Sequence, residues 1–205
     1  MKLMYVTQGP LSVNTYFLIN TDKNTAVVID SGENYKLVKK IEKENGFKIT
    51  AVLLTHAHFD HAGNAKALQD DGAEIIASKI DAEKLAKGQT LATAFGRQEN
   101  QLIADRTFDD GDLLELEGIK IKVLLTPGHT DGSACFIVDD MLFSGDTLFY
   151  ETVGRTDFPT GDREQLINSV KRLFDLKGEY RVFPGHQEFT TLSHEREHNF
   201  FVDYD

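Results

Sequence analysis

The stretch Thr55-His56-Ala57-His58-Phe59-Asp60-His61 decides the fold, and it follows directly on the apolar run Ala51 to Leu54. This run lacks alternation, as expected of a strand that is buried on both faces. Residues two apart in an extended chain point the same way, so His56 and His58 can present their imidazoles to one point in space. The stretch therefore begins as the carboxyl end of a buried strand that carries two potential metal ligands.

Asp60 and His61 complete this cluster. They fall at the turn into a helix that we expect to begin near Ala62-Gly63-Asn64, and they aim at a neighbouring point. A single histidine is usually a solvated or hydrogen-bonded ring. Three imidazoles and one carboxylate at the end of a buried strand are instead a dense set of metal ligands. The cluster therefore predicts a metal centre.

Three further segments end a strand in a ligand-type residue beside a glycine, which lets the backbone approach closely. Each alone is a weak signal, since Pro-Gly is usually only a turn. The segments are Leu125-Thr126-Pro127-Gly128-His129, Phe143-Ser144-Gly145-Asp146-Thr147 and Val182-Phe183-Pro184-Gly185-His186. Together with the first cluster they supply seven potential ligands, enough for two ions that share one bridge.

The first half of the chain alternates strands with a helix. Residues 27–29 and 51–54 have the composition of buried strands, and residues 37–45 between them have the pattern of an amphipathic helix that ends at Gly46. Residues 79–106 contain two weakly periodic helical pieces, polar and interrupted by glycine. We expect them to form a loop over a site.

The second half is rich in hairpins. Asp110-Gly111 and Glu117-Gly118 are turn signals, and residues 118–123 alternate with period two. Further along, Asp162 can cap a strong helix whose apolar stripe reaches Phe174. This mixture predicts two sheets flanked by helices.

Composition bounds the class of protein. With 205 residues, 40% of them hydrophobic and 27% charged, the chain has room for one substantial core, so we expect a single domain over residues 1–205. No apolar run approaches the length of a membrane span, and the N-terminus lacks the features of a signal peptide. The net charge of −11, without a block of Lys and Arg, argues against a nucleic-acid partner.

The one cysteine, Cys135, cannot form an intramolecular disulfide, which suits a reducing cytoplasm. It lies in the middle of an apolar strand and is interpreted as a small core residue. We therefore expect a soluble, cytoplasmic protein without a membrane partner.

The chain resembles the metallo-β-lactamase superfamily in four motifs that occur in order between His56 and His186: THAHFDH, PGHT, SGDT and PGH. It is similar in particular to the short members of the glyoxalase II (hydroxyacylglutathione hydrolase) branch, through residues 14–16, 28–32 and 144–149. The segment Gly154-Arg155-Thr156-Asp157-Phe158 is shared by small glyoxalase II-like hydrolases and by persulfide dioxygenases.

The resemblance implies an α+β fold, a four-layer αββα sandwich with two divalent metal ions at one edge of the two sheets. We expect zinc in first place, with iron or manganese as alternatives. The resemblance assigns His56, His58 and His129 to the first ion, Asp60, His61 and His186 to the second, and Asp146 to the bridge between them.

The implied activity is that of a metal-dependent hydrolase acting on a small-molecule thioester. S-lactoylglutathione or a similar S-acyl thiol is the expected substrate, attacked by a hydroxide that bridges the metals. Asp60 and Asp146 are the candidate catalytic carboxylates, because Asp60 can orient the hydroxide and Asp146 holds both ions. We expect a monomer or a small homo-oligomer.

The chain differs from longer glyoxalase II enzymes in the part that binds the thiol group of the substrate. Longer glyoxalase II enzymes continue into a helical C-terminal domain that grips glutathione, whereas nineteen residues follow His186 here. We therefore expect the thiol end of the substrate to lie largely in solvent. The alternative is that Lys84, Lys87 or Arg97 rebuilds that part of the pocket.

Arg155 falls where the longer enzymes carry a lysine that contacts the substrate. It is therefore a candidate substrate-binding residue that would contact an anion. The alternative is a structural arginine paired with Asp157.

The main alternative function is a persulfide dioxygenase with one iron held by His56, His129 and Asp146, an arrangement that resembles the facial triad. Residues 159–162 and Pro184-Gly185-His186 look more like the hydrolase. A lactone or a phosphodiester is an alternative substrate for a hydrolase. The complete ligand set argues against a non-catalytic binding module.

Overall fold

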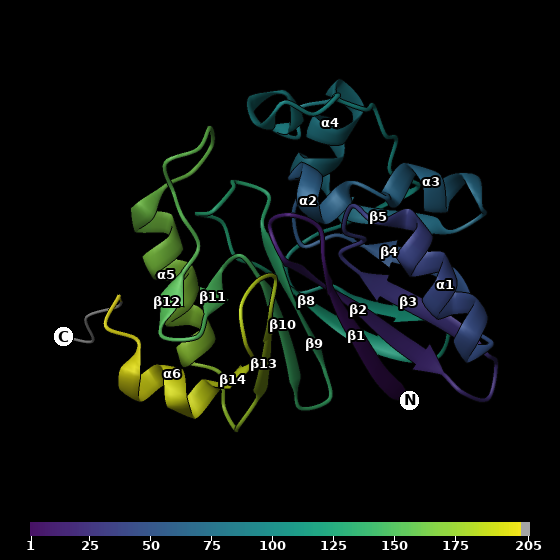
Figure 1. The fold of residues 1–205 in the computed structure, drawn as a ribbon. Coiled ribbons are helices and arrows are strands. Elements are labelled where there is room, and N and C mark those ends of the chain that lie inside the picture. Colours follow the sequence, from purple (N-terminus) through teal and green to yellow (C-terminus); the bar gives the residue numbers. More distant parts are fainter. Residues whose placement is uncertain (202–205) are drawn as a thin grey trace.

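The computed structural model describes residues 1–201 and contains two six-stranded sheets, with a separate two-stranded pair beside them (Figure 1). The first sheet has the order β1-β2-β3-β4-β5-β6, formed by Lys2–Gln8, Val13–Asn20, Thr25–Ile29, Lys48–Leu53, Glu74–Ser78 and Arg106–Phe108. The second has the order β14-β13-β10-β9-β8-β7, which in chain order are Leu113–Leu116 (β7), Ile119–Leu125 (β8), Ala134–Val138 (β9), Met141–Gly145 (β10), Arg181–Pro184 (β13) and Thr190–Thr191 (β14). The small pair is β11 (Leu148–Phe149) and β12 (Thr152–Val153).

Strand directions bring several strand ends to one edge. In the second sheet β8 and β10 are each antiparallel to β9, and β13 is parallel to β10. The strands β8, β10 and β13 therefore run the same way, and their carboxyl ends lie at the same edge. The end of β4 reaches this edge from the first sheet, since the amide of Ala134 donates a 2.9 Å hydrogen bond to the carbonyl of Thr55. Four chain segments can thus meet there.

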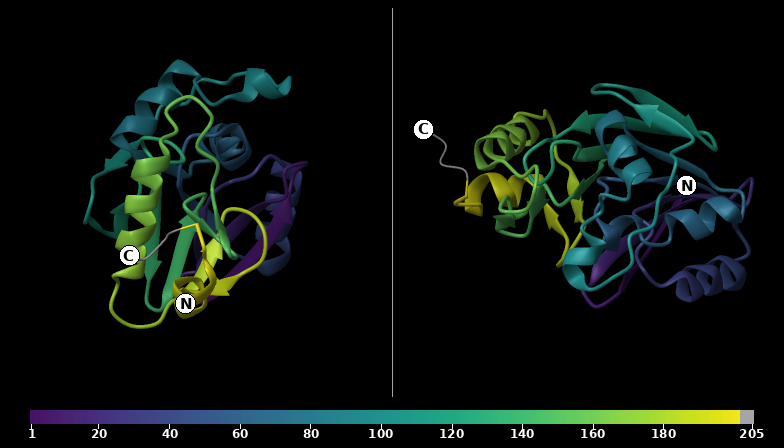
Figure 2. Two further views of the ribbon diagram at one scale, coloured as in Figure 1. Left: turned by 90° about the vertical axis from the view of Figure 1, so that its left-hand side faces the viewer. Right: turned by 90° about the horizontal axis from the view of Figure 1, so that it is seen from above.

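Helices cover the outer face of each sheet. On the first sheet lie α1 (Tyr35–Asn45), α3 (Ala65–Asp70) and α4 (Lys79–Lys87), and on the second α5 (Arg163–Phe174) and α6 (Leu192–His198), as Figures 1 and 2 show. Buried side chains form three clusters, one between the sheets and one between each sheet and its helices. The expected four-layer αββα sandwich is confirmed.

The strand β2 shows how one segment serves two cores. Its residues from Val13 to Ile19 are all buried. Because side chains alternate along a strand, Tyr16 and Leu18 enter the core between the sheets, while Phe17 and Ile19 enter the core beneath the helices. A continuous apolar strand is therefore the sequence signature of a layer buried on both sides.

The helix ends follow the expected signals at two places. Gly46 ends α1 in the left-handed conformation, with φ 68°. Asp162 caps α5 by accepting a 3.0 Å hydrogen bond from the amide of Gln165. The prediction that a helix begins near Ala62 is wrong. A short helix, α2 (Phe59–Ala62), begins three residues earlier, and α3 follows as a separate helix. The strand β4 ends at Leu53, and His58 has extended backbone angles directly before α2.

The interpretation of residues 79–106 is partly confirmed. They contain α4 and a short 3-10 helix, η1 (Ala92–Phe95), but the strand β6 that begins at Arg106 was not expected. This strand has three residues and pairs in parallel with β5, so its existence depends on a neighbour distant in the chain. Over residues 1–201, no helix is both long enough and apolar enough to cross a membrane.

The Asp162 cap can be tested by its stability effect. Asp162→Ala should lower the free energy of unfolding by about 1 kcal/mol, because an amide in the first turn of α5 loses its acceptor. Asp162→Asn is the matched control, since asparagine caps about as well as aspartate. Urea denaturation measures both variants. Equal stability of the alanine and asparagine variants would contradict the cap.

Candidate metal centre

The structure brings the seven expected ligand residues together at the shared edge of the sheets. His56 and His58 follow β4, Asp60 and His61 lie in α2, and His129, Asp146 and His186 follow β8, β10 and β13. Their ligand atoms form three groups whose members lie within 4.8 Å of one another: His56, His58 and His129; Asp60, His61 and His186; and His56, His61 and Asp146.

The first group has the spacing of ligands around one ion. The Nδ1 atom of His58 lies 3.0 Å from Nε2 of His56 and 3.0 Å from Nε2 of His129. Two nitrogens bound at 2.0–2.1 Å to one tetrahedral ion lie about 3.3 Å apart. The three nitrogens therefore need only a small adjustment to share a metal.

The second group has similar spacing. The Nε2 atom of His186 lies 3.2 Å from Nε2 of His61 and 3.3 Å from Oδ2 of Asp60. The remaining pair, His61 Nε2 and Asp60 Oδ2, is 3.7 Å apart. Two nitrogens and one carboxylate oxygen thus face a common point.

Asp146 lies between the two groups. Its Oδ1 atom is 3.4 Å from His61 Nε2, and its Oδ2 atom is 3.5 Å from His129 Nε2 and 3.6 Å from His186 Nε2. Oδ1 is buried and accepts no hydrogen bond from the described part of the chain. A buried carboxylate oxygen without a donor is expected where a cation binds, so the donor set fits two divalent ions.

The charges within the cluster also favour a cation. Burial lowers the pKa of His56 well below the usual imidazole value, and the neighbouring imidazoles lower it further, so this ring is neutral and able to bind a metal. Burial lowers the pKa of His61 too, but the carboxylates of Asp146, Asp60 and Asp30 outweigh it and raise the pKa to about 10. These carboxylates hold a positive charge at the centre of the cluster, and a divalent ion supplies such a charge.

Outer hydrogen bonds orient three of the imidazoles. Each uses Nδ1 to bond a fixed oxygen, so its Nε2 points into the cluster. The acceptors are Oδ2 of Asp30 for His61 at 2.8 Å, the carbonyl of Arg155 for His129 at 2.7 Å, and the carbonyl of Leu11 for His186 at 2.9 Å.

Asp30 is a functional residue that sequence reasoning did not assign. Besides orienting His61, its buried carboxylate accepts hydrogen bonds from the amide of Thr55 at 2.9 Å and from its hydroxyl at 2.8 Å. It therefore fixes both the start and the end of the THAHFDH stretch. The available signal was an aspartate directly after the apolar strand β3, with Gly32 close behind.

The turn that carries His186 is fixed by β2. The side-chain amide of Asn14 donates to the carbonyls of Pro184 and Gln187, at 3.1 and 2.9 Å. The hydroxyl of Tyr16 donates to the same Pro184 carbonyl at 2.5 Å. The first sheet thereby positions a ligand that the second sheet supplies.

A cavity of about 540 Å³ opens over the ligands and is lined by five of them, His58, Asp60, His129, Asp146 and His186. Its wall is otherwise largely apolar and aromatic, with the residues Leu11, Phe59, Leu91, Phe95, Phe149 and Phe158. This size is typical of a small-molecule site.

The basic residues singled out in the sequence are already paired. Arg155 lines the cavity and forms two 2.6 Å hydrogen bonds to the carboxylate of Asp157, so the structural pairing is present, while a contact to a substrate anion stays a prediction. The residues of the alternative, in which the pocket for the thiol is rebuilt, form ion pairs as well, namely Lys84 with Asp81 and Asp131, Lys87 with Glu83, and Arg97 with Glu33.

Known relatives match nearly the whole chain. A probable metallo-hydrolase of Streptococcus pyogenes is 35% identical, with 98% of this chain and 90% of that protein covered. The hydroxyacylglutathione hydrolase GloC of Haemophilus influenzae is 36% identical, with 93% and 92% covered.

Solved structures agree with the fold. BLEG-1 B3 metallo-β-lactamase matches with a TM-score of 0.92 at 30% identity, over 99% of this chain and all of that one. TTHA1623 in a di-iron-bound form matches at 0.87 and 34%, over 97% and 100%, and ETHE1 from Myxococcus xanthus at 0.83 and 28%, over 98% and 84%. The family model of the metallo-β-lactamase superfamily matches residues 8–186. The chain therefore belongs to the metallo-β-lactamase superfamily of metal-dependent hydrolases.

Proposed function

We propose that the protein hydrolyses a thioester, S-lactoylglutathione or a similar S-acyl thiol, with two bound divalent metal ions. The observation that carries this proposal is the pair of three-ligand groups joined by Asp146 at the floor of one cavity. The 36% identity to a hydroxyacylglutathione hydrolase supports a thioester as the substrate. Zinc is proposed in first place, because tetrahedral sites of imidazole and carboxylate suit it, with iron or manganese as alternatives.

Bound at these residues, two divalent ions would supply a water of lowered pKa and a Lewis acid for the acyl carbonyl. Asp60 lines the cavity. Burial raises the pKa of its carboxyl, but the nearby His61 and His186 outweigh this effect and hold the pKa well below the usual value. An ionised Asp60 can therefore accept a hydrogen bond from the attacking water and orient it. Asp146 keeps the two ligand groups at a fixed separation.

No side-chain nucleophile is needed. Cys135 is fully buried in β9, and burial raises the pKa of its thiol to about 11, so it stays protonated. It contacts Thr126 and does not line the cavity. This supports its interpretation as a core residue and direct attack by water.

The persulfide dioxygenase stays the alternative function, and the likeness to ETHE1 is compatible with it. A single iron on His56, His129 and Asp146 would leave four of the seven residues without a role, namely His58, Asp60, His61 and His186. The ligand atoms of Asp60, His61 and His186 lie within 3.7 Å of one another, as ligands of a second ion would, which favours the hydrolase. The cytoplasmic location and the monomeric or small homo-oligomeric state stay predictions.

Metal content is the first test of this proposal. Fully loaded, active protein should contain two equivalents of metal by mass spectrometry, because two complete ligand groups are present. Oxygen uptake with glutathione persulfide serves as the control and should be absent. One equivalent in fully active protein, together with oxygen uptake, would establish the dioxygenase instead.

The second test separates Asp146 from Arg155. Asp146→Ala should lower kcat more than about 100-fold and reduce the metal content, since even an outer partner of a ligand contributes 10–100-fold. Arg155→Ala should mainly raise KM, by less than about tenfold, because the arginine is half exposed and shares its charge with Asp157. Steady-state kinetics with metal analysis measures both. An equal loss of kcat in Arg155→Ala with intact metal content would give the arginine a role in the transition state.

The third test concerns the thiol. Because Lys84, Lys87, Arg97 and Arg155 are all ion-paired, few contacts are available for the carboxylates of glutathione. S-lactoylglutathione and a truncated lactoyl thioester should differ in kcat/KM by less than roughly 100-fold. A preference of several thousandfold for the glutathione compound would show that these residues re-pair around the peptide.

A further inference from the structure

An aromatic wall stands over the metal ligands. Phe59, Phe95 and Phe158 line the cavity in a row, with ring centroids 5.1 Å apart for the first pair and 5.9 Å for the second. The ring of Phe158 also meets that of His58 edge to face at 6.0 Å. The wall therefore extends from His58, a ligand of the first group, to the exposed residue Phe95.

Among the described residues that line the same cavity, no lysine or arginine is free of an ion-pair partner. Among the described residues that line it, Arg155 is the only lysine or arginine, and its guanidinium is held by Asp157 and lies 3.8 Å from the centre of the Phe158 ring. An anionic group placed against this wall would lose its hydration without gaining a free partner. The charged peptide of a thiol such as glutathione is therefore a poor occupant.

A thioester has an acyl group and a thiol group. A charged thiol group such as glutathione does not suit the aromatic cavity, because it would find no free cation among the described side chains there. The acyl group is the remaining occupant. A lactoyl group is small and carries a hydroxyl, so it would leave most of a 540 Å³ cavity to water against apolar rings. The cavity suits a larger and less polar acyl group.

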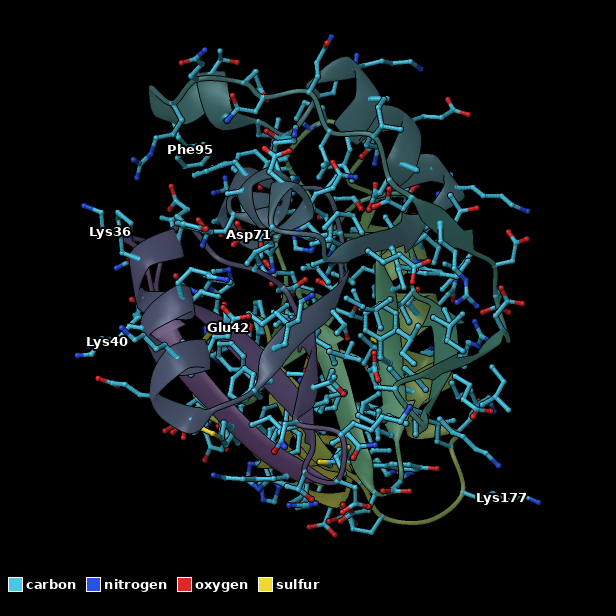
Figure 3. All side chains as sticks on the ribbon, turned by 90° about the vertical axis from the view of Figure 1, so that its right-hand side faces the viewer. Lys36, Lys40, Glu42, Asp71, Phe95 and Lys177 are labelled. Atoms are coloured by element: carbon cyan, nitrogen blue, oxygen red, sulfur yellow. The ribbon has the colours of Figure 1, made fainter. Side chains whose placement is uncertain are left out.

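Building on the thioester hydrolase proposed above, we propose that the preferred substrates carry an apolar acyl group larger than lactoyl, such as a medium-chain or arylacetyl group, held by Phe59, Phe95 and Phe158. Phe95 is the specificity-determining member of this wall. It lies in η1, away from the two sheets in Figure 3, and the residue is 41% exposed. A bound acyl chain would cover this exposed ring.

The experiment compares thioesters of one small neutral thiol, N-acetylcysteamine, with acetyl, lactoyl, butanoyl, hexanoyl and phenylacetyl groups. A fully buried methylene should add about fourfold to kcat/KM. Hexanoyl should therefore exceed acetyl by at least roughly 30-fold, allowing for partial burial of its four extra methylenes. Lactoyl should resemble acetyl.

Phe95→Ala should reduce the hexanoyl-to-acetyl ratio at least about fivefold, because much of the apolar contact is lost. Phe200→Ala is the matched control, since that ring is 84% exposed and lines no part of the cavity. Its ratio should stay within about twofold of the unchanged protein. Circular dichroism of both variants checks that they fold.

Failure of this proposal is distinct from failure of the thioester hydrolase. If thioesters are cleaved but lactoyl or acetyl is preferred, or if Phe95→Ala leaves the ratio unchanged, the acyl-group proposal is wrong and the hydrolase stands. If no thioester is cleaved, the hydrolase is wrong. Calorimetry with unreactive ketone analogues, in which a methylene replaces the sulfur, then tests whether the cavity binds apolar chains. An apolar site predicts that longer chains bind more tightly and with a more negative heat-capacity change, and that Phe95→Ala weakens both trends. The absence of these trends would overturn the proposal of an apolar site.

Discussion

The close approach of Asp146 to imidazoles from both sheets is the constraint on which the site depends. Its carboxylate lies 3.4 Å from His61 on the side of the first sheet, and 3.5 and 3.6 Å from His129 and His186 on the side of the second. A buried carboxylate with one oxygen lacking a donor is costly unless a cation is present. Metal binding should therefore also stabilise the contact between the sheets, since the ions join ligands that the two sheets supply separately.

Glycine is required where the backbone approaches Asp146. A Cβ on Gly185 would lie 2.4 Å from Oδ1 of Asp146, and one on Gly154 would lie 1.9 Å from its carbonyl oxygen. Another residue at position 154 would require a shift of the backbone, and one at position 185 would displace the ligand side chains of Asp146 and His61. The glycines of the PGH and Gly-Arg segments thus set the distance between ligand groups rather than simply making turns.

The sequence predicts the local part of this arrangement well. Ligand-type residues at the ends of apolar strands identify the metal centre, because strand direction and alternation are local properties. The roles of Asp30 and Asn14 could not be predicted in this way. Asp30 acts on His61 and Asn14 on the His186 turn, across separations of 31 and more than 160 residues that only the tertiary fold closes. The early start of α2 and the short strand β6 were missed for the same reason.

Phe59 of the aromatic wall lies in α2 beside the ligands Asp60 and His61, whereas Phe95 lies on a different part of the fold from the ligands. Five of the seven ligands follow strands of the packed sheets and two lie in α2, whereas Phe95 lies in the short η1 helix. A change in the wall costs little core packing, because Phe95 is largely outside the buried clusters. Proteins named as a B3 β-lactamase and a hydroxyacylglutathione hydrolase can therefore both resemble this chain, since a common frame positions the metals while loops select the substrate. It follows that the substrate should be inferred from the aromatic wall and from the charged side chains of the cavity rather than from the metal ligands.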